Sequence, residues 1–191
     1  VSNENQEEIA TILEQTEKLD FLIQSLVKLS RMESGIIAVH SEDTTIKQML
    51  ESIQQQFNVK VREKNITLSL CDTDLHVRCD AKWTVEALGN IVDNAIKYTA
   101  CGGNVQIKVE QYSFFVKIDI IDDGIGIEKE EIPKIFGRFY RSLSVADQPG
   151  VGIGLFLARE IIQAQKGYIK VTSKRGKGST FSVFLPIAKK E

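Results

Sequence analysis

A glycine-rich segment stands at the end of an apolar strand pattern, in residues 122–127 with the sequence DDGIGI. Its first residue, Asp122, has a carboxylate that only accepts hydrogen bonds, which suits an exocyclic amine such as that of adenine. Gly124 and Gly126 lack the side chains that would hold a ligand away from the backbone. Acidic residues and glycines also fill ordinary turns, so this segment indicates a nucleotide pocket only in combination with others.

A second glycine-rich segment opens a predicted helix further along the chain and contains Gly150, Gly152 and Gly154. Backbone amides at a helix N-terminus are a ready site for phosphate. The segment is not a P-loop, because no Gly-Lys-Ser/Thr ends it, and it follows a long loop, unlike a dinucleotide fingerprint. Residues 176–181 (GKGSTF) form either a third loop that approaches the ligand or a plain hairpin turn.

The predicted helix over residues 81–98 carries polar side chains along one side, at spacings of three and four residues. These are Glu86, Asn90, Asp93 with Asn94, and Lys97. The amide oxygens of the two asparagines can complete the oxygen shell of Mg²⁺, while the lysine meets phosphate oxygens. Tyr98 can offer its ring to a base. A solvated helix face is the alternative interpretation of the same residues.

A long connection, residues 128–149, separates the two glycine segments and is typical of a functional lid. Arg138 and Arg141 can reach a phosphoryl group in transfer from such a lid. Three aromatic residues would anchor it: Phe136, Phe139 and Tyr140. In the alternative interpretation the aromatic residues belong to the core and the arginines face solvent.

The elements that must position these residues mix helices and strands without a strict βαβ rhythm. Predicted helices cover residues 4–33, 45–57, 81–98 (N-capped by Asp80) and 151–165, with one short helix inside 128–149. Predicted strands cover residues 36–39, 66–71, 76–79, 105–110, 113–121, 168–173 and 179–185. This order predicts an α/β (α+β) two-layer sandwich, with a mixed β-sheet and helices on one face, preceded by one long bundle-forming helix.

The long first helix shows a heptad seam and is expected to end at Gly35 as its C-cap. The seam consists of Ile9, Ile12, Thr16, Leu19, Ile23, Leu26 and Ser30, and Leu13, Leu22 and Leu29 widen it. A stripe of this width suits a helical bundle, and no second helix of the kind follows in the chain. Partners from outside the chain are therefore expected, with docking on its own domain as the alternative.

Bulk properties exclude several classes of function. The net charge of -2 gives no reason to expect nucleic acid as a partner. We find neither an apolar run of membrane-spanning length nor a signal peptide. Three widely spaced cysteines, Cys71, Cys79 and Cys101, do not form a zinc pattern and are interpreted as reduced thiols of a cytosolic domain.

In this order, the segments resemble the catalytic ATP-binding domain of two-component sensor histidine kinases, in the gyrase, chaperone and histidine kinase ATPase superfamily. The match runs from about residue 34 to residue 187. Residues 86–98 resemble the N box of that family, 122–127 its G1 box, 136–141 its F box, and 150–155 and 176–181 its later glycine boxes. Residues 28–35 resemble the end of the second dimerisation helix.

The resemblance implies binding of ATP with Mg²⁺ under a mobile lid. Asp122 would hold the adenine amino group, and Asn90 and Asn94 would serve Mg²⁺ and the phosphates. The remaining nucleotide contacts would come from Lys97, Tyr98, Thr180 and the glycines at 124, 126, 150, 152 and 154. Either Arg138 or Arg141 would address the γ-phosphate. Glu86 occupies the position that activates water in the wider superfamily, a role that kinases do not require.

Two departures from the family pattern are mild, Asp123 in place of a common asparagine and Val151 in place of a small polar residue. A phosphoacceptor histidine is missing, because neither His40 nor His76 has the acidic neighbour and helical setting of the acceptor. We therefore expect residues 1–34 to be part of a dimerisation domain without its acceptor helix, and residues 35–191 to be the catalytic domain.

The expected function is transfer of the ATP γ-phosphoryl group to a histidine outside this fragment, for relay to a response regulator. Expected partners are the histidine-bearing dimerisation helix of the parent kinase, a receiver domain, and a second copy in a full-length homodimer. The expected location is the cytoplasmic part of a membrane-anchored sensor. The alternatives are an ATP hydrolase with Glu86 as base and a non-catalytic, nucleotide-gated interaction module.

Overall fold

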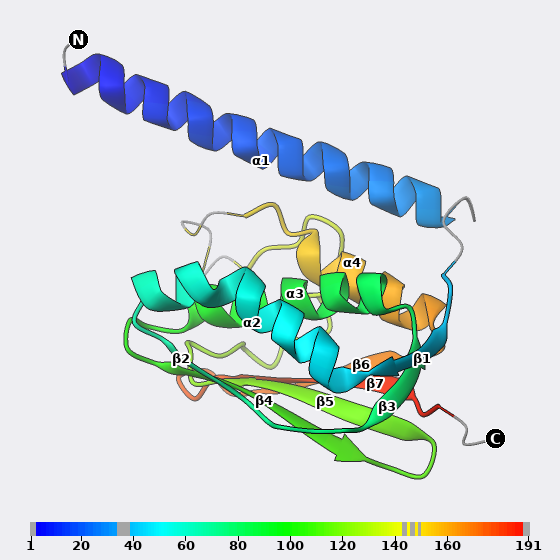
Figure 1. Cartoon of the computed structure of the whole chain (residues 1–191). Coiled ribbons are helices and arrows are strands. Elements are labelled where there is room, and N and C mark those ends of the chain that lie inside the picture. Colours follow the sequence, from blue (N-terminus) through cyan, green and yellow to red (C-terminus); the bar gives the residue numbers. More distant parts are fainter. Residues whose placement is uncertain (1–2, 34–38, 143–144, 146–147, 149, 189–191) are drawn as a thin grey trace.

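The computed structural model describes residues 3–33, 39–142, 145, 148 and 150–188. Three helices form a layer on one face of a five-stranded sheet, and a long helix runs along the far side of that layer (Figure 1). The helices are α1 (Asn3–Glu33), α2 (Ile46–Glu63), α3 (Ala81–Tyr98) and α4 (Gly154–Ala164). The predicted two-layer sandwich with a leading helix is confirmed.

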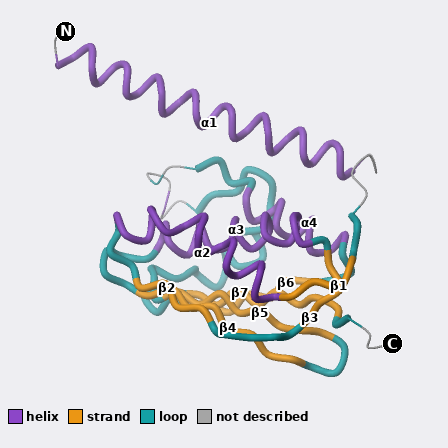
Figure 2. Tube along the Cα trace, in the orientation of Figure 1, coloured by secondary structure: helices purple, strands orange, loops and turns teal. Residues whose placement is uncertain are grey.

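The main sheet is mixed, with the strand order β2-β4-β5-β7-β6. Its strands are β2 (Thr67–Leu70), β4 (Asn104–Gln111), β5 (Phe115–Asp122), β6 (Tyr168–Ser173) and β7 (Ser179–Pro186). The β2–β4 pair is parallel and the other pairs are antiparallel. A separate two-stranded ribbon pairs β1 (Glu42–Thr45) with β3 (His76–Cys79). Figure 2 shows that the helices and strands occupy separate layers.

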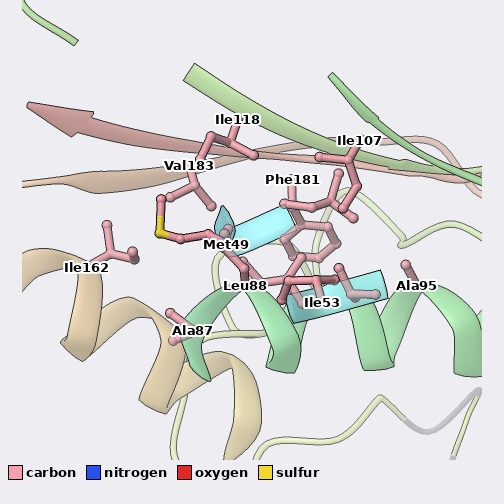
Figure 3. Close-up of a cluster of buried hydrophobic side chains, with 14 of the residues drawn as sticks. Met49, Ile53, Ala87, Leu88, Ala95, Ile107, Ile118, Ile162, Phe181 and Val183 are labelled. Carbon is pink, nitrogen blue, oxygen red and sulfur yellow. The ribbon is translucent and has the colours of Figure 1, made fainter. Parts of the chain in front are cut away.

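The hydrophobic core fills the space between the helix layer and the sheet (Figure 3). Leu88 and Ala95 on α3 face Ile107, Ile118 and Val183 on the strands (Figure 3). The apolar positions of α3 recur with helical spacing, and those of β5 alternate, so each element buries one face. The polar side of α3 is thereby turned away from the sheet.

Several predicted boundaries shift for local reasons. Helix α2 continues past Phe57 to Glu63, because nothing breaks it before Asn65, whose positive φ of 55° leaves the helical region. Helix α4 begins at Gly154 and not at residue 151, because Gly152 has a φ of 76°. Residues 128–139 form successive turns, and Val145 has 3₁₀ geometry, so within the described residues the predicted short helix is reduced to turns and this single residue.

Two predictions concern residues between α1 and β1. The predicted strand over 36–39 and the Gly35 cap fall on 34–38, outside the described residues, and Val39 lies in a loop. Strand β1 was not predicted, because its sequence EDTT has no apolar alternation and its pairing with β3 is a tertiary contact.

Among the side chains described on α1, those that contact the helix layer lie on one side of the helix. Leu22 packs against the core and Ser25 is buried. The other large apolar side chains described on α1 are exposed: Ile9, Ile12, Leu13, Leu19, Ile23, Leu26 and Val27. This leaves most of the predicted seam uncovered by its own domain. Among the described residues, no helix combines the length and the apolar character needed to cross a membrane.

Candidate nucleotide-binding site

A cavity of about 700 Å³ lies between α2, α3, the glycine segments and the connection before α4. This volume is in the range of small-molecule and cofactor sites. Asp122 lines it from the end of β5, while Asn90, Asn94 and Lys97 line it from α3. The structure therefore brings together the predicted residues of the strand end and the helix.

Helix α3 presents its amide side chains to this cavity because its start and its buried face are both fixed. The Asp80 side chain caps the helix by accepting from the Trp83 N–H at 3.2 Å. Asn90 Nδ2 donates to the Glu86 carbonyl at 3.0 Å, and a Cβ on Gly154 would lie 2.9 Å from Asn90 Oδ1. The amide oxygen of Asn90 thus faces the N-terminus of α4, where phosphate is favoured.

Asp122 is nearly buried, and its Oδ1 accepts hydrogen bonds from the backbone N–H groups of Gly124 (2.9 Å) and Ser179 (3.2 Å). Within the described residues, no donor is bonded to Oδ2. Burial raises the pKa of this carboxyl, and the two backbone N–H donors act in the opposite direction. The orientation of the carboxylate is therefore fixed by the loops, while one oxygen remains available to a ligand donor.

The segment before α4 contacts the other site residues through its glycines. A Cβ on Gly150 would lie 2.8 Å from Lys97 Nζ, and a Cβ on Gly152 would lie 2.6 Å from the Tyr140 carbonyl oxygen. The backbone carbonyl beside Gly152 leaves no room for a side chain, and Gly150 and Gly152 both have a positive φ, of 145° and 76°. The glycines let the connection close tightly over α3.

Positive charge gathers along one wall of the cavity. Lys97 Nζ lies 4.9 Å from the centre of the Tyr98 ring. Burial lowers the pKa of Lys97, and the nearby Arg141 lowers it further. Arg141 also lines the cavity and donates to the carbonyls of Val145 (2.8 Å) and Gln148. This wall of the cavity is suited to an anionic group.

Comparison with known proteins agrees with this geometry. Residues 79–189, more than half of the chain, match the family model described as histidine kinase-, DNA gyrase B- and HSP90-like ATPase. The chain belongs to this ATPase family. The domain is 34% identical to the sensor histidine kinase WalK of Bacillus subtilis over 177 residues, which are 90% of the chain and 29% of WalK. It is 30% identical to the sensor protein kinase PmrB of Pseudomonas aeruginosa over 171 residues, 89% of the chain and 36% of PmrB.

The chain thus spans roughly a third of the length of these relatives, between 29% and 36%. Among solved structures, it resembles full-length ShkA in complex with AMPPNP, with a TM-score of 0.83 and 20% identity over 100% of this chain and 40% of that one. It also resembles the histidine kinase ThkA in complex with the response regulator protein TrrA. The TM-score is 0.80 and the identity 22%, over 98% of this chain and 53% of that one. At these identities the likeness concerns the fold.

In this ATPase-family domain, four residues predicted for the site lie outside the cavity lining: Glu86, Gly124, Arg138 and Thr180. Thr180 lies on β7 between Ser179 and Phe181, which both line the cavity, and alternate strand residues face opposite sides. A Cβ on Gly124 would lie 2.5 Å from the Tyr98 carbonyl oxygen, so this glycine makes room for the end of α3.

The two predicted arginines lie in different places, and one of them is outside the cavity lining. The Arg138 guanidinium stacks on the Phe156 ring at 4.7 Å, on α4 and outside the cavity lining. The Arg159 guanidinium lies 5.5 Å from the same ring and 5.6 Å from the ring of Phe136. These contacts attach the connection before α4 to the helix itself. Arg141 is therefore the F-box arginine that the structure places at the cavity.

Three residues of α2 and its C-cap also line the cavity and were not predicted: Lys60, Glu63 and Lys64. Lys60 Nζ lies 2.6 Å from Asp93 Oδ1, and Lys64 Nζ donates to the carbonyls of Ile96 and Lys97 at 2.8 and 2.6 Å. Their spacing of three and four residues marks one helix face, but an exposed charged face carries no signal for a ligand.

Proposed function

We propose that this chain is the ATP-binding catalytic part of a sensor histidine kinase. It transfers the γ-phosphoryl group of ATP to a histidine that lies outside the chain, for relay to a response regulator. The observation that carries the proposal is the placement of Asp122 in the same cavity as Asn90, Asn94 and Lys97, with the α4 N-terminus beside Asn90. Asp122 can accept a hydrogen bond from a base, and the residues of α3 with the α4 N-terminus can hold phosphates.

Each of these residues has a part in positioning the nucleotide. Asp122 accepts a hydrogen bond from the adenine amino group through the oxygen that the loops leave available. Tyr98 lies along the base, with Lys97 beside it. Lys97 and Arg141 neutralise the phosphates, and the helix that begins at Gly154 directs its amides to them.

The residues present fit a magnesium ion brought by ATP. Asn90 uses Nδ2 within α3, so its Oδ1 is the atom offered to the cavity, and Asn94 lines the same wall. No cluster of three or more His, Cys, Asp or Glu side chains suited to a metal occurs in the described residues. Amide and phosphate oxygens would therefore hold the ion. Held by Asn90 and Asn94, the ion would supply positive charge against the charge that develops on the phosphoryl group during transfer.

In the reaction, an imidazole nitrogen forms a bond to the γ-phosphorus while the bond to the β,γ-bridging oxygen breaks. ADP leaves with the electron pair, and the imidazole loses a proton. Lys97 and Arg141 stabilise charge on the phosphate oxygens, and the lid excludes water that would compete with the histidine. This chain contributes orientation and charge, and the histidine that becomes phosphorylated lies outside it.

The acceptor and the partners lie outside this chain. We propose that residues 1–34 belong to the dimerisation domain and residues 35–191 to the catalytic domain of a parent homodimer in the cytoplasm. The exposed apolar side chains of α1, among them Ile12 and Leu19, support contact with further bundle helices. The complex of ThkA with TrrA supports a response regulator as the downstream partner.

The proposal is tested by calorimetric titration of Mg-ATP into wild type, Asp122→Asn and Asp123→Asn. We expect saturable binding that falls at least about tenfold in the Asp122 variant. Asp123 is the matched control, since its carboxylate bonds to Asn104 and does not line the cavity. In a second assay, labelled ATP should phosphorylate a separate, acceptor-bearing dimerisation bundle. Absence of nucleotide binding by the folded wild type would overturn the proposal.

A further inference from the structure

We infer that Glu63, at the end of α2, recognises the sugar hydroxyls of the bound nucleotide. The inference rests on the proposed function, because it assumes that ATP occupies the cavity. It concerns a wall of the site that the N box and the glycine segments do not supply.

Helix α3 sets the direction in which a nucleotide lies. Asn90 stands next to Gly154 and the start of α4, which is the phosphate end. Tyr98 stands next to Gly124 and Asp122, which is the base end, since the Tyr98 carbonyl accepts from the Ile125 N–H at 3.2 Å. The eight-residue separation of Asn90 and Tyr98 corresponds to about 12 Å along the helix. The ribose joins base and phosphates, so it lies beside the middle of this stretch.

The last turn of α2 is attached to α3 between the middle of this stretch and its base end. Lys60 forms its ion pair with Asp93, and Lys64 bonds to the carbonyls of Ile96 and Lys97. All three α3 residues lie between Asn90 and Tyr98 in the helix. Two lysines thus fix the backbone on either side of Glu63 against the sugar region of the cavity.

Glu63 has the chemistry that a sugar requires. Glu63 is an exposed residue at the cavity, and within the described residues its carboxylate has no hydrogen-bond or ion-pair partner. Ribose hydroxyls are donors, and an ionised carboxylate is purely an acceptor. The lysines beside it do not compete for it, because both are engaged with α3. The geometry assigns Glu63 as a specificity-determining residue for ribonucleotides.

The test compares ATP, 2′-deoxy-ATP and 3′-deoxy-ATP in calorimetric titrations of wild type, Glu63→Gln and Glu63→Ala. Wild type should bind ATP about fivefold tighter than at least one deoxy analogue, which is typical of a hydrogen bond to a partly exposed charged group. Glu63→Ala should bind ATP as weakly as that analogue, with the analogue itself unchanged. Glu63→Gln should retain part of the difference, because its amide oxygen still accepts.

Glu51→Ala is the matched control on the same helix, because Glu51 does not line this cavity. It should keep the preference for ATP. The inference is overturned if wild type binds the three nucleotides equally, or if Glu63→Ala weakens all three by the same factor. Those results leave ATP binding itself intact. Failure of wild type to bind any of the three would instead overturn the proposed function, and this inference with it.

Discussion

Lys28 Nζ on α1 lies 2.6 Å from Glu86 Oε1 on α3, so an ion pair joins the long helix to the N box one turn before Asn90. Both side chains are about a third exposed, at 35% and 32%. The Glu86 carboxylate is thereby directed toward α1 and does not line the cavity. A carboxylate held in this way is poorly placed to take a proton from water at the γ-phosphate.

This relationship separates the kinase from the hydrolase alternative. We expect Glu86→Gln to leave ATP affinity within about twofold and to leave the rate of phosphate release unchanged. Lys28→Ala should lower the free energy of unfolding by less than about 1 kcal/mol, because the pair is partly exposed. Calorimetry, a phosphate-release assay and denaturant unfolding measure these quantities. Phosphate release that disappears in Glu86→Gln would favour the hydrolase.

The ionised carboxylate of Asp122 is expected to lower the free energy of unfolding at neutral pH, although the same carboxylate binds the ligand. Its pKa is raised above the ordinary value, so the folded state holds the proton more tightly than the unfolded state. Its contribution to stability is full below the unfolded pKa of 3.8 and is lost as the pH rises through the folded pKa. Asp122→Asn should therefore be at least as stable as wild type near about pH 7, with the difference vanishing near about pH 3.

Thermal unfolding of both proteins across this pH range measures the effect. The Asn side chain retains an oxygen for the Gly124 and Ser179 donors, so the loops should stay in place. An Asp122→Asn variant that is less stable than wild type at neutral pH would contradict the expectation.

Gly178 and Gly176 provide a matched pair in the last hairpin. Both have a positive φ, of 83° and 74°, but a Cβ on Gly178 would lie 1.9 Å from the Asp122 carbonyl oxygen, whereas nothing lies within 4 Å at Gly176. Gly176→Ala should cost about 1 kcal/mol from backbone strain alone. Gly178→Ala should cost more than about 3 kcal/mol and also disturb Asp122. Urea unfolding checks both values, and equal costs would show that close packing is not the reason.

The two arginines of the F box should differ in effect. Arg141 lines the cavity, so Arg141→Ala should slow phosphoryl transfer to a separate acceptor bundle by about 100-fold. Arg138 stacks on Phe156, so Arg138→Ala should cost about 0.5–1 kcal/mol of stability and change transfer only about threefold. Single-turnover transfer from labelled ATP measures both. A larger loss of transfer in Arg138→Ala would place that residue at the γ-phosphate.

Much of the fold follows from local patterns. Helix α3 has the predicted bounds and cap, because both the periodic apolar face and the Asp80 cap are properties of neighbouring residues. The alternating strands and the turn-forming glycines predicted the main sheet for the same reason. The polar side of α3 predicted Asn90, Asn94 and Lys97 at the cavity, since a single helix face carries them.

Contacts between distant segments were decided only by the tertiary structure. The sequence contains the motif residue Thr180, yet the pairing of β7 with β5 turns its neighbours Ser179 and Phe181 to the cavity. It contains Lys28 and Glu86, which are 58 residues apart, and nothing near either residue indicates that the two form an ion pair. It contains Glu63, whose place in the site depends on how α2 packs on α3. Composition and periodicity determine which face an element buries, whereas the partner of each polar face depends on packing that brings remote residues together.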